Sequence, residues 1–168
     1  MSLRSLSEDV ILNMLPKKWE LLSAPRNNIL GAVDAITKQL HIFHNETYIN
    51  SQSICDFLSE IAKTYVGKPI TVVLDNASYQ RCELVQGFAV SLNIELLFLP
   101  PYSPNLNIIE RVWKFIKKKS LNCRYYETFK LFREAILKSI ASCNDEWKDE
   151  MESLLSLEFQ MFPEEEAA

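Results

Sequence analysis

The stretch that decides the fold is LFLPPYSPNLNIIERVWKFIKKK, residues 97–119. It runs from an apolar, strand-like segment through three prolines into a segment that ends in three lysines. Clustered prolines and asparagines are typical of a loop, and the apolar spacing after Ile108 is typical of a helix. Glu110 would lie in the first turn of that helix. This acid could either help the helix to begin or hold a metal ion.

The helix-capping interpretation of Glu110 depends on Asn107. If Asn107 is the N-cap residue, Glu110 is the third helical residue, and Asn-x-x-Glu then matches a capping box. The carboxylate also suits the positive end of the helix dipole, and the lysines at 117–119 suit the negative end. On this interpretation Glu110 needs no further function.

A second acid follows an apolar run upstream, in the stretch VVLDNASYQ, residues 72–80. Asp75 falls where a buried strand would meet its loop, and Asp-Asn is common turn chemistry. Functional side chains also collect at the carboxyl ends of central strands. Because Mg²⁺ and Mn²⁺ prefer carboxylate oxygens, Asp75 and Glu110 could share a metal ion if the strand and the helix are neighbours.

The remaining pattern predicts a sheet with helices packed on it. Apolar and β-branched runs predict strands over 28–36, 41–49, 70–75 and 94–100, of which the first two form a hairpin. Apolar residues at helical spacing predict helices over 51–65, 81–92 and 127–142 and from about 108, and Ser51 is expected to cap the first. Strands that alternate with helices indicate an α/β fold with a mixed sheet.

Composition is that of a globular protein of ordinary size. The chain has 168 residues, of which 48% are hydrophobic and 24% charged, and its net charge is −4. We expect a cytoplasmic protein without a membrane span. The four cysteines lack metal-binding spacing, so free thiols are expected. The acidic average argues against DNA binding over the whole surface but allows a local basic face.

Two motifs resemble those of DDE transposases, in the bacterial insertion-sequence branch of the mariner-type superfamily. They are VVLDNASYQ and LPPYSPNLNIIERVWKFIKKK, and thirty-four residues separate Asp75 in the first from Glu110 in the second. The resemblance extends more weakly over residues 28–140. It implies a ribonuclease H-like fold with helices on both faces of the sheet, in which an acidic triad binds two Mg²⁺ (or Mn²⁺) ions. Asp75 matches the second acid of this catalytic, metal-binding triad, and Glu110 matches the third.

The resemblance also implies an activity and partners. The family cuts DNA at transposon ends and joins the freed 3′-hydroxyl to target DNA, so DNA and further copies of the chain are the expected partners. Arg111, Lys114, Lys117 and Lys118 lie on the predicted helix that carries Glu110. Those that face the same way as Glu110 are expected to contact phosphates.

The chain departs from the family pattern at its N-terminal end. The first acid belongs on a core strand upstream of 28–36, and residues 1–27 contain no convincing equivalent. Asp9 is followed by too short an interval, and Asp34 lies in a strand where the family needs no acid. We therefore expect an irregular segment over 1–27 and a partial catalytic domain over 28–144, whose first core strand is missing or replaced. An acidic tail is expected over 145–168.

More than one function remains open at this point. The leading one is a transposase catalytic domain for metal-dependent DNA cleavage and strand transfer, inactive or weak here because the first acid is not identifiable. The alternative is a non-catalytic transposase remnant that binds DNA or a partner, the latter through an exposed sheet edge near 28–36. The PPYSPNLNIIE loop disfavours a ribonuclease H-like nuclease or a Holliday-junction resolvase.

Overall fold

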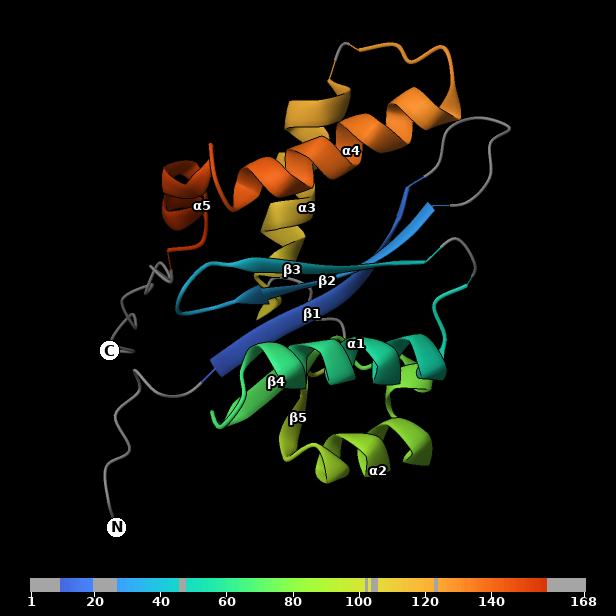
Figure 1. Ribbon diagram of the computed structural model, residues 1–168, viewed down its shortest axis with the longest axis vertical. Coiled ribbons are helices and arrows are strands. Elements are labelled where there is room, and N and C mark those ends of the chain that lie inside the picture. Colours follow the sequence, from blue (N-terminus) through green and yellow to red (C-terminus); the bar gives the residue numbers. More distant parts are fainter. Residues whose placement is uncertain are drawn as a thin grey trace, which may run out of the picture.

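A five-stranded mixed sheet forms the centre of the molecule, with helices on both of its faces (Figure 1), which confirms the predicted α/β fold. The computed structural model describes residues 10–19, 27–45, 48–101, 103, 106–122 and 124–156. The strands lie in the order β3-β2-β1-β4-β5. Their bounds are β1 Val10–Trp19, β2 Asn27–Asp34, β3 Leu40–Asn45, β4 Ile70–Leu74 and β5 Ile94–Phe98.

The central strand of the sheet is β1, which the sequence pattern did not predict. β1 pairs antiparallel with β2 from Leu12 to Trp19 and parallel with β4 from Val10 to Met14. The expectation that the first core strand is missing is therefore wrong, and residues 10–19 belong to the sheet rather than to an irregular segment. The expected open edge near β2 is also absent among the described strands, because β1 and β3 flank β2.

β1 is hard to predict from the sequence because Pro16 and two lysines interrupt its apolar pattern. Leu12 and Met14 are fully buried on one face of the strand, as strand alternation requires. Pro16 has no main-chain N–H to donate, but it lies beyond Met14, where pairing with β4 ends. The proline is tolerated because only β2 flanks that part of β1.

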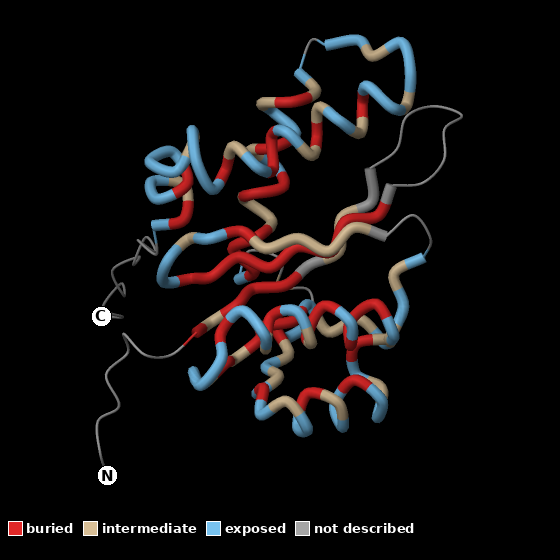
Figure 2. Tube along the Cα trace, in the orientation of Figure 1, coloured by how far each residue is buried: buried red, intermediate tan, exposed pale blue. Residues whose placement is uncertain are grey.

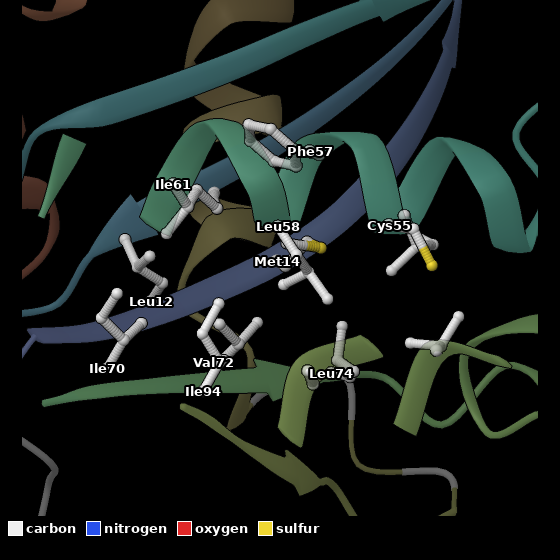
Figure 3. Close-up of a cluster of buried hydrophobic side chains, with 14 of the residues drawn as sticks. Leu12, Met14, Cys55, Phe57, Leu58, Ile61, Ile70, Val72, Leu74 and Ile94 are labelled. Atoms are coloured by element: carbon white, nitrogen blue, oxygen red, sulfur yellow. The ribbon is translucent and has the colours of Figure 1, made fainter. Parts of the chain in front are cut away.

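Two helices, α1 (Ser51–Thr64) and α2 (Glu83–Ser91), cover one face of the sheet (Figure 1). The N-cap of α1 is Asn50, whose side chain accepts a hydrogen bond from the N–H of Ser53 at 3.0 Å, so the predicted cap Ser51 is wrong. Apolar side chains of α1 pack on β1 and β4 (Figure 3). They include Cys55, Phe57, Leu58 and Ile61 of α1, with Leu12 and Met14 of β1 and Ile70, Val72 and Leu74 of β4 beneath them.

Three helices cover the other face: α3 (Ile109–Leu121), α4 (Phe129–Cys143) and α5 (Lys148–Leu154). A second buried core lies between them and the sheet (Figure 2). Gly31 of β2 faces α3, and a Cβ atom at this position would collide with the indole ring of Trp113. The close approach of α3 to β2 therefore requires a glycine here.

The acidic tail begins with a packed helix, α5, and residues 157–168 lie outside the described part of the chain. Cys55, Cys82 and Cys143 are free thiols, as predicted. None of the helices in the described ranges is long and apolar enough to cross a membrane.

Candidate active site

Asp75 follows the last residue of β4, at the carboxyl end of the parallel strands. The main-chain O of Leu74 still accepts a hydrogen bond from the N–H of Leu99, at 2.8 Å, so the sheet is ordered up to this point. Asp75 itself is exposed. The chain then turns at Asn76, whose φ of 75° lies in the left-handed region that asparagine tolerates. The strand end thus presents the Asp75 carboxylate at the edge of the core.

Tyr79, in the short 3-10 helix η1 (Ser78–Gln80), lies close enough to Asp75 to respond to its charge. Partial burial raises the pKa of the Tyr79 hydroxyl to about 12, and the negative charge of Asp75 adds to the shift. Tyr79 therefore supplies a neutral hydroxyl near the carboxylate throughout the physiological pH range.

The predicted capping box at the start of α3 is wrong. The N-cap residue is Ile108, and no side chain caps this helix. Glu110 is half-buried in the first turn, and its N–H donates to the main-chain O of Asn107 at 3.1 Å. Within the described part of the chain, no hydrogen bond or ion pair occupies the Glu110 carboxylate. The capping role predicted for Glu110 is therefore not filled, although its place in the first turn still suits the positive end of the helix dipole.

Asn107 joins the start of α3 to the centre of the sheet. It is buried, and its Nδ2 donates to the main-chain O of Met14 in β1 at 3.3 Å. Met14 pairs in register with Leu74, the residue before Asp75. This hydrogen bond brings the first turn of α3, which carries Glu110, to the end of the sheet that carries Asp75.

β1 supplies no acid to this end of the sheet, because its sequence, VILNMLPKKW, contains neither Asp nor Glu. Asn13 alternates with Leu12 and Met14, whose side chains pack against α1. Asn13 is therefore directed to the α3 side of the sheet, where it is buried opposite Val33 and Val73. β1 is therefore present, but Leu12, Asn13 and Met14, its residues near the candidate site, are uncharged.

Of the other two acids considered from the sequence, the structure describes only Asp34. Asp34 is buried at the end of β2, where its carboxylate accepts hydrogen bonds from a main-chain N–H of the following turn at 2.8 Å and from the hydroxyl of Tyr65 at 3.4 Å. These contacts give Asp34 a structural role. Asp9 lies outside the described residues.

The oxygen atoms offered by these residues are enough to bind one hard cation in part, but not to surround it completely. The Oδ1 atoms of Asn76 and Asn107 are buried and have no hydrogen-bond partner in the described structure. They could add amide oxygens to the carboxylates of Asp75 and Glu110. No group of three or more His, Cys, Asp or Glu side chains among the described residues could hold a metal. The set suits a single Mg²⁺ or Mn²⁺ completed by water and phosphate.

The basic residues of α3 point in two directions, and one set is covered by α5. Arg111 donates to the main-chain O atoms of Leu154 and Ser156, at 3.5 and 3.4 Å. Lys119 forms an ion pair with Glu150 at 2.8 Å. The Lys119 ammonium also lies over the rings of Phe115 and Trp147, at 5.2 and 4.9 Å from their centroids.

Lys114, Lys117 and Lys118 of α3 are exposed. Lys114 and Lys117 lie four and seven residues after Glu110, so these three side chains share one face of the helix. Three of the four predicted DNA-contacting residues are therefore on open surface, and Arg111 instead contacts the end of α5.

Comparison with known proteins establishes the family. The profile of the "DDE superfamily endonuclease" family matches residues 17–133, from within β1 to within α4. The chain belongs to this family. An uncharacterized protein of Sinorhizobium fredii, y4pE/y4sA, is 31% identical over 83 residues, a match that covers 49% of this chain. The chain spans 59% of the length of that relative.

Solved structures of transposase and integrase catalytic cores share the fold. The catalytic domain of Mos1 transposase, solved with raltegravir and Mg, has a TM-score of 0.60 at 12% identity, over 88% of this chain and 83% of that one. The catalytic core of HTLV-2 integrase, solved with magnesium in a dimeric form, has a TM-score of 0.58 at 20% identity, over 80% of this chain and 86% of that one. At these identities the likeness establishes the fold, and the predicted ribonuclease H-like architecture is confirmed.

Proposed function

We propose that this chain is the catalytic domain of a transposase, built for metal-dependent DNA cleavage and strand transfer. The observation that carries the proposal is the hydrogen bond from Asn107 to Met14, which brings the helix of Glu110 to the Asp75 end of the sheet. Family membership and the Mg- and Mn-containing relatives support a divalent ion as the cofactor.

In this proposal Asp75 and Glu110 hold the ion through their carboxylate oxygens. A bound divalent ion supplies charge stabilisation to the attacking or leaving oxygen of a phosphodiester. Asn76 and Asn107 lie beside the two acids and carry buried amide oxygens. Tyr79 offers a neutral hydroxyl that can donate to a phosphate oxygen without adding charge.

We expect the chain to be inactive or weakly active. Two-metal chemistry requires enough carboxylate oxygen to hold both ions close together, and β1 offers no acid. Two carboxylates and water bind a divalent ion more weakly than a full set of acids does, since ligand charge count tunes affinity. The chain would then keep the fold and part of the site with little turnover.

The proposed DNA contacts lie on the face of α3 that carries Glu110. Lys114 and Lys117 are exposed there, Lys118 is exposed beside them, and all three would neutralise phosphates near the cleavage point. We do not assign this role to Arg111, which contacts the end of α5. Transposon ends and target DNA are the proposed partners. The dimeric form of the HTLV-2 integrase core supports the expectation of a homo-oligomer.

A second candidate function is a non-catalytic protein of transposase ancestry that binds DNA or a partner chain. The observation that favours it is the acid-free sequence of β1. The exposed lysines of α3 would serve this function equally well, because phosphate contacts need no metal.

Nicking of supercoiled DNA in the presence of Mg²⁺ or Mn²⁺ tests the catalytic proposal, with Asp75→Asn and Glu110→Gln as matched variants. Nicking that both variants abolish would demonstrate catalysis and contradict the expected inactivity. Absence of nicking, together with Mn²⁺ binding that both variants weaken, is the expected result. DNA binding without nicking and without Asp75-dependent Mn²⁺ binding would favour the second candidate function.

A further inference from the structure

We infer that Asn107 is a positioning residue, whose side-chain amide ties the first turn of α3 to β1 and thereby sets the place of the Glu110 carboxylate. This inference rests on the proposed metal site for its consequence, but its geometry is independent of any metal. The contact joins residues 93 positions apart in the chain, so it links two elements rather than shaping one.

Asn107 makes two hydrogen bonds near the candidate site, one through its side chain and one through its main chain. Its Nδ2 donates to the main-chain O of Met14 at 3.3 Å, and its main-chain O accepts the N–H of Glu110 at 3.1 Å. Met14 in turn pairs with Leu74, next to Asp75. A single residue therefore connects the backbone that precedes one acid to the helical turn that carries the other.

The side chain of Asn107 is buried, so its hydrogen bonding affects the free energy of folding. Asn107 is only 2% exposed, and its Oδ1 lacks a hydrogen-bond partner among the described residues. A buried amide oxygen without a partner is costly, so an apolar residue of the same size would be favoured if packing were the only demand. Donation to Met14 therefore offsets part of the cost of burying this amide, and the unpaired Oδ1 leaves an acceptor open to a bound group.

The ordinary alternative, that Asn107 caps α3, does not fit the geometry. Ile108 is the N-cap residue, and among the described residues no side-chain cap hydrogen bond is present at this helix. The donor group of Asn107 faces the sheet instead. Its role is therefore exerted between α3 and β1.

Asn144 provides a matched control at a distance from the two acids. Its side chain also ties a helix end to a strand: its Oδ1 accepts from the N–H of Leu40 at 2.8 Å, and its Nδ2 donates to the O of Leu40 at 2.7 Å. Asn144 follows α4, and Leu40 begins β3. Asn107→Leu and Asn144→Leu each remove one such link while keeping similar side-chain volume.

The experiment measures Mn²⁺ affinity by electron paramagnetic resonance of free Mn²⁺, together with amide hydrogen exchange, in the full chain. Asn107→Leu should weaken Mn²⁺ binding by about tenfold or more, the usual effect of losing a group that orients a metal ligand. It should also speed exchange at the Glu110 N–H. Asn144→Leu should lower stability but leave the Mn²⁺ affinity and the Glu110 exchange unchanged.

The outcomes separate this inference from the proposed function. If Asn107→Leu changes neither Mn²⁺ affinity nor exchange at Glu110, the inference is overturned while the metal site stands. If Asp75→Asn leaves Mn²⁺ binding unchanged, the metal site is overturned, and exchange at Glu110 alone decides the role of Asn107. Asn107→Ala, which adds no apolar bulk, replaces the leucine variant if that variant does not fold.

Discussion

Residue 15 is the position at which an added carboxylate tests the incomplete site most directly. Met14 pairs with Leu74, so extension of the parallel register sets the backbone of residue 15 beside Asp75. We predict that Leu15→Asp raises Mn²⁺ affinity by about tenfold, because ligand charge count tunes the affinity for a hard cation. A Mn²⁺ titration of the variant and the unaltered chain measures the change.

The control for this gain is the double variant Leu15→Asp with Asp75→Asn, which should return the affinity to that of the unaltered chain or below. A gain that survives the loss of Asp75 would mean that the new acid binds Mn²⁺ elsewhere. Loss of stability without any gain in affinity would mean that residue 15 of β1 does not reach the site.

His41 makes stability depend on pH. Its Nε2 lies 2.6 Å from the hydroxyl O of Tyr65, which donates to Asp34. Burial lowers the pKa of His41 below its usual 6.5, although the charge of Asp34 opposes the shift. The unfolded chain therefore takes up the proton at higher pH than the folded chain. The free energy of unfolding should fall as pH drops below about 6.5.

We predict that His41→Phe loses this part of the pH dependence. Urea unfolding at pH 7.5 and 5.5 measures it, as the difference between the unaltered chain and the variant. An identical loss of stability on acidification in the His41 variant and the unaltered chain would rule out His41 as its source.

Sequence motifs indicate Asp75 and Glu110 as candidate metal ligands, because each stands in a motif with a specific neighbourhood, and this assignment stays a prediction. The sequence was not enough for Asn107. Local spacing made Asn107 a helix cap, whereas its side chain bonds to Met14, which is 93 residues away. The role of a polar side chain that acts across the sheet depends on strand register, and no local pattern carries that information.

At the scale of elements, the contact between α3 and β2 depends on Gly31. A Cβ atom there would collide with Trp113, which is fully buried, so the helix or the indole ring must move. We predict that Gly31→Ala costs about 1–3 kcal/mol in the free energy of unfolding. Chemical denaturation measures this cost.

Gly87 in α2 is the matched control for Gly31. No atom lies within 4 Å of a Cβ built at Gly87, and the residue sits in an exposed part of the helix. Gly87→Ala should therefore stabilise the chain by about 0.5–1 kcal/mol, through helix propensity. Equal effects at the two glycines would contradict a specific α3–β2 contact.

The two faces of α3 should differ in DNA binding. We predict that Lys114→Ala and Lys117→Ala each lower DNA affinity and reduce the salt slope by about 1, because each removes one phosphate contact. Lys63 is exposed on α1, and Lys63→Ala should change neither the DNA affinity nor the salt slope. Arg111→Ala should chiefly lower stability, since Arg111 contacts the end of α5. DNA titrations at several salt concentrations decide between these residues.

The helices could be predicted because their apolar residues recur at helical spacing, as in α1 with Ile54, Phe57, Leu58 and Ile61 all buried. β1 could not, since Pro16 and the lysines beyond it break the alternation that marks a strand. These residues are compatible with the sheet only because β4 ends its pairing at Met14. Whether a proline is tolerated in a strand depends on where the neighbouring strand stops, which is a property of the assembled sheet.

At the scale of the whole molecule, β1 lies between the two buried cores, and its side chains contribute to both of them. Leu12 is fully buried against α1, and the second core lies on the opposite face of the same strand. We predict that Leu12→Ala costs about 2–5 kcal/mol and leaves a single unfolding transition. Tryptophan fluorescence, to which Trp113 and Trp147 on the α3 side contribute, and far-ultraviolet circular dichroism should report the same midpoint. Two separate midpoints would mean that the cores unfold independently.

The strand order could not be predicted without β1. The hairpin of β2 and β3 was expected, and so were β4 and β5 as further strands, but β1 is the strand that joins the hairpin to them. With β1 in place, the two pairs of strands form one continuous sheet.

The unequal edges of this sheet limit how two copies of the chain could act together. At β3 the side chain of Asn144 already occupies both main-chain hydrogen-bonding groups of Leu40, whereas no described strand flanks the outer side of β5. If two copies paired strand to strand through β5, two-fold symmetry would make that pairing antiparallel. The Asp75 ends of the two copies would then face in opposite directions. Copies that cut two DNA ends side by side must meet through another surface.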